Sequence, residues 1–284
     1  MNIKESLIYA ASKLQAVGIK SANLESRILM QHVTGKSIEY LLARSEEELT
    51  QQEQIIFEDL VNRRTLLEPI AYIVGYKEFY SYQFIINDKV LIPRQDTEII
   101  VDAILSDIKI NAELTILELG IGSGCIAVSL LLEMPNSNVT ATDISNEAIA
   151  IASQNAIKHK VSDRFKIINS NWFDNLEKQE FDIIVSNPPY ISFDDTVYMS
   201  SEPLKYEPHL ALFAEDNGLA SYYIIAKEAK GFLKQNGKLF LEIGFNQLTA
   251  VTEIFISYGY TVKQVYKDLE ARDRGILITS PHSG

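Results

Sequence analysis

Apolar side chains recur at intervals of three and four through the first 65 residues, which is the pattern of amphipathic helices. Gly18 and Gly35 stand where two such helices would end, and Thr50–Glu53 has the spacing of a capping box ahead of a further apolar run. The pattern predicts a small helical unit over residues 1–68. Periodicity alone leaves two functions open for this unit, a packing or dimerisation module and a docking surface for a macromolecular substrate.

Between Pro69 and Pro93 the pattern changes to β-branched and aromatic residues, interrupted by Gly75 and by Asn87-Asp88. Short runs of this kind between turn residues are typical of strands joined by tight turns. Residues 69–93 are therefore predicted to form a β-hairpin linker.

The remaining residues, 94–284, alternate short apolar strands with amphipathic helices, the first helix being expected from Thr97 onward. The expected strands cover residues 114–119, 138–142, 165–168, 181–186, 238–243, 261–265 and 275–279. The expected helices between them cover residues 125–132, 147–158, 219–233 and 248–258. Buried strands that alternate with helices predict an α/β domain, with a mostly parallel seven-stranded sheet and helices on both faces.

Composition narrows the class of protein without identifying a function. With 46% hydrophobic and 23% charged residues, the chain is typical of a soluble globular protein, and it has no apolar run long enough to span a membrane. Its formal net charge of −12 disfavours non-specific binding to nucleic acid. One cysteine and four scattered histidines show no metal-ligand spacing. We expect a cytoplasmic monomer with no metal, no membrane contact and no direct nucleic-acid contact.

The strongest local signal is the segment ELGIGSG at residues 118–124, which follows an apolar strand and opens a helix. A glycine-rich turn lets a ligand approach the backbone, and the helix N-terminus offers free N–H groups. Asp143 lies at the end of the next strand, where a carboxylate can accept both hydroxyls of a ribose. These features predict an adenosine-containing cofactor. Because Gly122, Gly124 and Ala127 also satisfy a dinucleotide fingerprint, the loop spacing alone leaves the cofactor class open.

A second motif, Asn187-Pro188-Pro189-Tyr190, follows the strand at residues 181–186 and should reach the same crevice. Consecutive prolines are stiff and lack N–H donors, so they present backbone carbonyls as acceptors. The Asn187 side-chain oxygen adds another acceptor. Two such acceptors can hold both hydrogens of a planar amino group, and Tyr190 can cover its face. The motif predicts a site for the conjugated amino nitrogen of a carboxamide or an adenine.

The glycine loop, Asp143 and the NPPY motif together resemble a class I methyltransferase that uses S-adenosyl-L-methionine. In order and spacing, the chain is similar over nearly its whole length to the release factor glutamine methyltransferases of the HemK type. Further segments carry this resemblance: residues 92–98 (IPRQDTE), 171–173 (NWF), 207–212 (EPHLAL), 241–244 (LEIG) and 267–274 (KDLEARDR).

The resemblance implies roles for residues that bind the cofactor. The glycine loop would line its methionine and ribose part through Gly120, Ile121, Gly122, Ser123 and Gly124. Asp143 would bind the ribose hydroxyls, and Trp172 would lie beside the adenine. Asn187 would also contact the cofactor, where its transferable methyl group meets the substrate.

The resemblance also implies a substrate. The family methylates the side-chain nitrogen (N5) of glutamine in the Gly-Gly-Gln motif of bacterial class 1 peptide chain release factors, which act in translation termination. Asn187 and the Pro188 carbonyl would hold the glutamine carboxamide, with Pro189 and Tyr190 completing the pocket. Under this resemblance residues 1–68 form a substrate-docking domain and residues 94–284 the methyltransferase catalytic domain.

Two segments depart from the family pattern. The usual Pro-Arg-Pro-Glu-Thr-Glu reads PRQDTE at residues 93–98, which indicates an altered loop with unaltered chemistry. Asp96 could cap the next helix, and Arg94 and Glu98 could help to close the active site, so their roles stay open. Ser170-Asn171 stands where an acidic residue often precedes the tryptophan, so contact with the adenine amino group can differ.

Three other functions compete. An adenine-N6 methyltransferase acting on nucleic acid would use NPPY equally well, but the net charge disfavours it. A nicotinamide-dependent dehydrogenase would leave NPPY unexplained. A cofactor-binding scaffold without activity would not need an intact NPPY motif.

Overall fold

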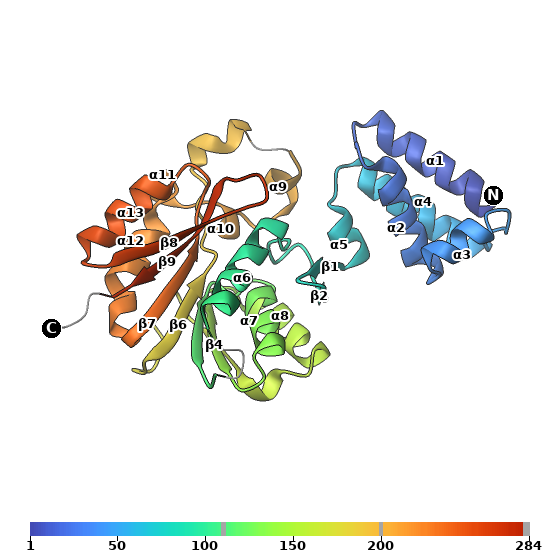
Figure 1. The fold of residues 1–284 in the computed structure, drawn as a ribbon. Helices are drawn as coiled ribbons and strands as arrows, with labels where there is room; N and C mark the ends of the chain where they lie inside the picture. The colour runs from blue at the N-terminus through green and yellow to red at the C-terminus, as the bar shows by residue number, and fades with distance from the viewer. Residues whose placement is uncertain (109–111, 199–200, 281–284) are drawn as a thin grey trace. The chain divides into compact units, whose positions relative to one another are not determined.

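The chain divides into two units in a computed structural model, which describes residues 1–108, 112–198 and 201–280 (Figure 1). The first unit comprises Met1–Tyr76 and Ser200–Tyr206, and the second comprises Lys77–Met199 and Glu207–Gly284. Within the described ranges, no helix is both long and apolar enough to cross a lipid bilayer.

The first unit is helical, as the spacing of its apolar residues predicts. Its helices are α1 (Ile3–Ala16), α2 (Ala22–Thr34), α3 (Ile38–Ala43), α4 (Gln51–Thr65), α5 (Ile70–Val74) and α9 (Ser201–Tyr206). The predicted capping box is present at the start of α4, where Thr50 and Glu53 each accept a hydrogen bond from the other's backbone N–H. Helices α1 to α5 share one apolar core that includes Leu14, Leu29 and Phe57.

Arg64, near the end of α4, joins three helices of this unit through a buried group of charges. Its Nε donates to Glu25 Oε2 of α2 at 2.6 Å, and its Nη2 lies 2.7 Å from Glu202 Oε1 of α9. The Arg64 and Glu25 side chains are only 5% and 11% exposed. The Tyr206 hydroxyl also donates to the Leu66 carbonyl at 2.8 Å. These contacts attach α9 to the first unit, although it lies far along the chain.

The segment predicted as a hairpin linker contains the hairpin and, before it, a short helix. The strands β1 (Tyr76–Phe79) and β2 (Tyr82–Ile85) form a two-stranded sheet. Residues 70–74 form α5 instead of linker, beginning after Pro69 and ending at Gly75 in the left-handed conformation. Its Ile73 and Val74 pack into the core of the first unit, so burial outweighs the β propensity of these residues.

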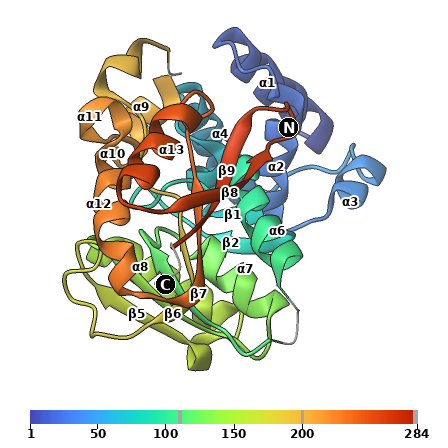
Figure 2. The ribbon, with the colours of Figure 1, turned by 60° about the vertical axis from the view of Figure 1, so that its left-hand side comes forward.

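A seven-stranded sheet forms the centre of the second unit (Figure 2). Its strands are β3 (Thr115–Leu119), β4 (Asn138–Asp143), β5 (Phe165–Asn169), β6 (Phe181–Ser186), β7 (Leu233–Glu242), β8 (Thr261–Lys267) and β9 (Asp273–Thr279). They lie in the order β5-β4-β3-β6-β7-β9-β8. The pairs from β5 to β7 are parallel, whereas β9 is antiparallel to both neighbours. The predicted α/β class and mostly parallel sheet are confirmed.

Helices cover both faces of this sheet (Figure 1). The α-helices of the second unit are α6 (Glu98–Asp107), α7 (Cys125–Glu133), α8 (Asn146–Lys158), α10 (His209–Leu212), α11 (Glu215–Gly218), α12 (Ala220–Glu228) and α13 (Leu248–Ser257). Its 3-10 turns are η1 (Gln95–Thr97), η2 (Ser162–Arg164), η3 (Phe193–Tyr198) and η4 (Ala229–Gly231). Helices α6, α7 and α8 contribute to one core, and α12 and α13 to the other. Ile116 and Leu117 point into different cores because successive strand residues face opposite sides.

One predicted helix is shorter than expected. Residues 219–233 were expected to be helical throughout, but α12 ends at Glu228 and β7 already begins at Leu233. Leu233 pairs with Phe181, and the register shifts between Phe181 and Ile183, so the first part of β7 bulges away from β6. This extra strand pairing, which comes from tertiary structure, outweighs the local helical pattern.

The register of the parallel strands aligns four carboxyl ends. Leu119 of β3 lies opposite Thr142 of β4 and Ser186 of β6, and Ser186 lies opposite Leu241 of β7. The glycine loop, Asp143, the NPPY segment and Glu242 therefore leave the sheet side by side.

We expect Arg64→Met to destabilise the first unit by about 3 kcal/mol, because it leaves Glu25 buried without its partner. Hydrogen exchange of the α2 and α4 amides, followed by mass spectrometry, measures this loss locally. Arg63→Met is the matched control, since the Arg63 side chain is 39% exposed and its pair with Glu68 should contribute less than about 1 kcal/mol. Equal losses in the two variants would contradict the importance of the buried group.

Candidate active site

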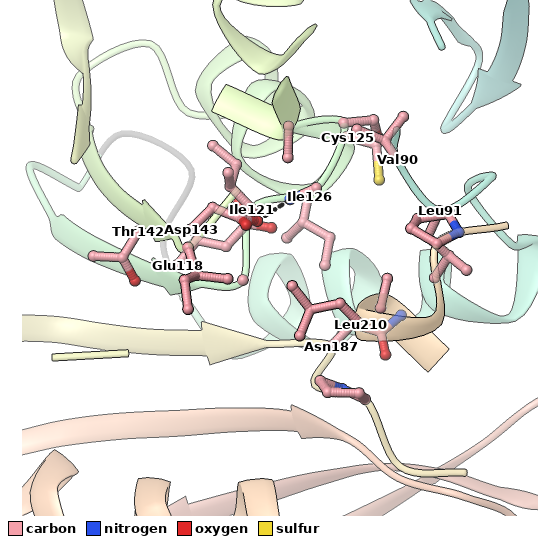
Figure 3. Close-up of a pocket in the computed structure, with 18 of the residues that line it drawn as sticks. Val90, Leu91, Glu118, Ile121, Cys125, Ile126, Thr142, Asp143, Asn187 and Leu210 are labelled. Atoms are coloured by element: carbon pink, nitrogen blue, oxygen red, sulfur yellow. Dashed lines mark hydrogen bonds between the residues drawn. The ribbon is translucent and has the colours of Figure 1, made fainter. Parts of the chain in front are cut away.

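A pocket opens where β3, β4 and β6 end (Figure 3). The predicted site residues that line it are Gly120, Ile121, Gly122, Ser123, Asp143, Trp172, Asn187 and Pro189. Three other predicted residues, Gly124, Pro188 and Tyr190, are not among its lining residues. The glycine loop and the NPPY segment, 63 residues apart between Gly124 and Asn187, thus reach one pocket.

The glycine loop presents uncovered backbone to this pocket. Gly120 and Gly122 have φ angles of +73° and +52°, a conformation that strains residues with a side chain. A Cβ built at either position would meet no atom within 4 Å, so no protein atoms pack against the loop there. The Gly122 N–H donates to Asp143 Oδ2 at 2.9 Å, which ties the loop to the end of β4.

The Asp143 carboxylate can accept further hydrogen bonds from a ligand. Its Oδ1 accepts from the Ser145 N–H at 2.9 Å, while its Oδ2 accepts from Gly122. Burial raises the pKa of Asp143, and the backbone hydrogen bonds oppose this rise. Because each carboxylate oxygen can accept more than one hydrogen bond, both can still receive hydroxyl donors from the pocket.

Trp172 lines the pocket after β5, next to Asn171, which also lines it. Its φ of +52° is rare for a bulky residue, and its side chain packs against the apolar core on one sheet face. This arrangement offers an aromatic surface for a flat ring.

The two ends of the NPPY segment are held by side chains from other elements. Asn187 Nδ2 donates to Thr97 Oγ1 at 3.1 Å, and the Tyr190 hydroxyl donates to Glu242 Oε1 at 3.0 Å. Burial is the largest cause that raises the pKa of Tyr190, so its phenol keeps its proton at neutral pH.

The backbone carbonyls of this segment differ in their partners. The Pro189 carbonyl accepts from Ser221 Oγ at 3.0 Å, and the Tyr190 carbonyl accepts from Gln247 Nε2 at 2.9 Å. The Pro188 carbonyl receives no hydrogen bond from the part of the chain that the structure describes. It is therefore the carbonyl of the proline pair that is left for an outside donor.

Gly218 lets the chain pass directly against this segment. A Cβ there would lie 2.1 Å from the Tyr190 carbonyl oxygen, and its φ is +82°. Only glycine meets both conditions without displacing Tyr190.

The chain is similar to known proteins over nearly its whole length. Residues 5–75 match the family described as the PrmC N-terminal domain, and residues 95–204 match the methyltransferase small domain. A release factor glutamine methyltransferase from Agrobacterium fabrum is 36% identical, over 96% of this chain and 95% of that protein. One from Salmonella typhimurium is 39% identical, over 89% of this chain and 91% of that protein.

This chain belongs to the release factor glutamine methyltransferase family. Solved structures agree on its fold at low identity. A methyltransferase from Pyrococcus furiosus is 18% identical with a TM-score of 0.53, covering 78% of this chain and 96% of that one. The family's class I S-adenosylmethionine-dependent methyltransferase fold is therefore shown both by sequence and by structure.

A further relative is longer. The bifunctional methyltransferase of Rickettsia typhi is 52% identical over 98% of this chain, and the match covers 57% of that protein. The chain thus spans little more than half the length of the curated relatives that it matches at this level.

The pocket suits the family's cofactor, S-adenosylmethionine. An uncovered glycine loop, a carboxylate with free acceptor capacity and an aromatic side chain lie around one cavity. They match in turn the amino-acid part, the ribose and the adenine of such a molecule. We therefore propose that Gly120–Ser123, Asp143 and Trp172 hold this cofactor.

The sequence left the roles of Arg94, Asp96 and Glu98 in the PRQDTE segment open, and the structure shows the contacts of each. Arg94 lines the pocket, and its Nη2 lies 2.7 Å from Oε2 of the buried Glu207. Glu98 accepts a hydrogen bond from the Tyr80 N–H at 2.9 Å. Of the roles left open for Asp96, that of a helix cap does not apply, since no side chain caps this helix.

Asp96 instead pairs with Arg274, with its Oδ2 3.3 Å from Nη2. Arg274 also pairs with Asp268 at 3.1 Å, so it holds the C-terminal KDLEARDR segment and the PRQDTE segment together. Asp96 thus keeps a carboxylate at a position where the family usually has glutamate.

Several side chains that line the pocket were given no role from the sequence. Glu118 lines the pocket, is 2% exposed and accepts from the Ala127 N–H at 2.9 Å, and burial raises its pKa well above the usual value. A charged residue inside an apolar strand is the signal that could have found it. Leu91 and Leu210 also line the pocket, and nothing in their local sequence distinguishes them from core leucines.

The pocket shows no sign of thiol or metal chemistry in the described part of the chain. Burial raises the pKa of Cys125 to about 12, so its thiol is not a nucleophile at neutral pH. No group of three or more metal-binding side chains occurs among the described residues.

We expect Asp143→Asn to bind S-adenosylmethionine at least about tenfold more weakly, because it loses charge-assisted hydrogen bonds. Titration calorimetry measures the affinity, and quenching of Trp172, the chain's one tryptophan, gives a second readout. The exposed Asp174→Asn is the matched control and should bind as the unaltered protein does. Equal affinity in both variants would remove Asp143 from the cofactor site.

Proposed function

We propose that this chain transfers a methyl group from S-adenosylmethionine to the side-chain nitrogen (N5) of the glutamine in the Gly-Gly-Gln motif of class 1 peptide chain release factors. The family of the chain supports glutamine and release factors as substrate. The observation that carries the proposal is the pair of acceptors at the NPPY segment. The Asn187 nitrogen is engaged by Thr97, and the Pro188 carbonyl has no donor among the described residues.

A carboxamide nitrogen is a poor nucleophile because its lone pair is delocalised into the carbonyl. Its two N–H groups would donate hydrogen bonds to the Asn187 oxygen and the Pro188 carbonyl. These bonds would polarise the N–H groups and direct the nitrogen lone pair away from the two acceptors. The cofactor supplies, when bound, an electrophilic methyl group on a positively charged sulfur. The acceptors would hold the nitrogen for in-line attack on that methyl carbon. The bond from the methyl carbon to sulfur would break as the new bond to nitrogen forms, and S-adenosyl-L-homocysteine would leave.

Orientation would provide much of the rate. Holding two reactants in contact can lower the activation free energy of a bimolecular reaction by roughly 7 to 11 kcal/mol. A strong base is not needed, because the nitrogen can lose its proton after attack. Consistent with this, no histidine is among the residues that line the pocket in the described part of the chain.

We further propose that the first unit docks the release factor. Its family match, the PrmC N-terminal domain, supports this over a role in packing alone. Several large apolar side chains of the unit are more than half exposed, namely Ile8, Leu24, Leu42, Ile55 and Leu66. Exposed apolar side chains are suited to binding a protein partner.

We expect labelled methyl to pass from S-adenosylmethionine to a purified class 1 release factor. The same factor with its Gly-Gly-Gln glutamine changed to alanine should stay unlabelled, as should duplex DNA. Label in the DNA would move the substrate to adenine, and label in the alanine variant would move the methylated position elsewhere.

In the same assay we expect Asn187→Ala to lower kcat by about a hundredfold, because it removes one of two oriented partners of the reacting nitrogen. Cofactor affinity should stay largely unchanged. Asn138→Ala, at the exposed opposite end of β4, is the matched control. Full activity of Asn187→Ala would disprove the proposed role of the motif.

A further inference from the structure

Glu242 ends β7 directly beside the NPPY segment. Because Leu241 lies opposite Ser186, the next positions, Glu242 and Asn187, are neighbours at this end of the sheet. Glu242 is 1% exposed and is not among the residues that line the pocket. A carboxyl that is buried behind the site, with no contact to the pocket, can act only through the side chains between them.

Two such side chains act on the Glu242 carboxyl. The Tyr190 hydroxyl donates to Oε1 at 3.0 Å. The Thr97 hydroxyl lies close enough to the same carboxyl to lower its pKa. Thr97 in turn accepts from Asn187 Nδ2 at 3.1 Å. Glu242 is therefore connected to both ends of the NPPY segment, to Tyr190 directly and to Asn187 through Thr97.

This connection determines which way the Asn187 amide faces. A threonine hydroxyl has one hydrogen to donate, and a carboxylate can only accept. If the Thr97 hydrogen goes to Glu242, Thr97 can offer Asn187 only a lone pair. Asn187 must then turn its NH₂ group toward Thr97, which leaves its side-chain oxygen for the substrate.

The surroundings of Glu242 bring its pKa close to neutral pH. Burial raises its pKa to about 7, while Thr97, Tyr190 and the nearby Arg274 act to lower it. Its Oε2 has no hydrogen-bond partner among the described residues, so burial is only partly compensated. A protonated Glu242 could donate to Thr97 and free the Thr97 hydrogen to point at Asn187, which would favour the opposite amide orientation.

We propose that Glu242 is a positioning residue for methyl transfer, which orients the Asn187 amide oxygen toward the substrate through Thr97 and fixes the far end of the NPPY segment through Tyr190. This inference rests on the proposed glutamine methylation. It assigns Thr97 and Glu242 to the site although neither belongs to the glycine loop or to NPPY.

The first test compares Thr97→Val with Thr97→Ser. Valine keeps the shape of threonine without its hydroxyl, so kcat on the release factor should fall about tenfold or more, with cofactor affinity unchanged. Serine keeps the hydroxyl and should restore most of kcat. A kcat of Thr97→Val near that of the unaltered enzyme would overturn the inference, and so would an equal loss in Thr97→Ser, which would indicate packing alone.

Tyr190→Phe is the second variant, in case Thr97→Val folds poorly. It removes only the hydroxyl that donates to Glu242, and kcat should fall while cofactor affinity is retained. Tyr260→Phe is its matched control, since Tyr260 is a buried tyrosine of the same apolar core whose hydroxyl has no side-chain partner among the described residues. Equal kcat in the two variants would count against the role of Glu242.

The second test is the pH dependence of kcat at saturating cofactor. The carboxylate form is required, so kcat should be full above the Glu242 pKa of about 7 and fall as the pH drops through it. Glu242→Gln should have a lower kcat above pH 7 and no such fall. The other groups around Glu242 are Arg274, Asp96, Tyr190, Tyr222 and Cys125.

Neither the two tyrosines nor Cys125 should account for the fall. Burial raises the pKa of both tyrosines and of Cys125, to about 12 for the thiol, so they stay protonated near neutral pH. The same fall in Glu242→Gln would assign it to another group and overturn this part of the inference. An unaltered enzyme that leaves glutamine unmethylated would instead overturn the proposed function, and the positioning role with it.

Discussion

Parallel pairing of β4, β3, β6 and β7 is the constraint on which the candidate active site depends. Hydrogen bonds between these strands bring together residues that are more than a hundred positions apart, such as Gly120 and Glu242. The loops themselves have little regular structure, so their placement is inherited from the sheet. A slip of one residue in β6 would turn Asn187 toward the opposite face and separate it from the glycine loop.

Three carboxyl groups gather at the same edge of the sheet. Burial raises the pKa of Glu118, Asp143 and Glu242, and each of these carboxyls is partly compensated by backbone N–H groups, side-chain donors or Arg274. Such groups are expensive to bury alone, so their partners must stay in place. The network therefore favours one arrangement of the loops over alternatives of similar shape.

Much of the fold and of the candidate site could be predicted from the sequence, because short segments of the chain carry the evidence for them. The glycine loop, Asp143 and NPPY each follow an apolar strand, and the α/β pattern alone predicts that strand ends meet. Contacts between distant residues could not be predicted, such as those that Thr97 makes with Asn187 and that Asp96 makes with Arg274. Helix α5 and the early start of β7 were missed for the same reason, since tertiary packing decides them.

Helix α9 gives the domain boundary an unexpected form. The chain enters the second unit after Tyr76, returns to the first unit for α9, and enters the second again at Glu207. The first unit is therefore discontinuous in sequence, and it is not a detachable N-terminal appendage. Removing residues 1–76 would take away Arg64 and Leu66, the partners of Glu202 and Tyr206 in α9. A gene fragment that ends at the hairpin would therefore encode only part of the first unit, and the remaining fragment would carry α9 without the helices that it packs against.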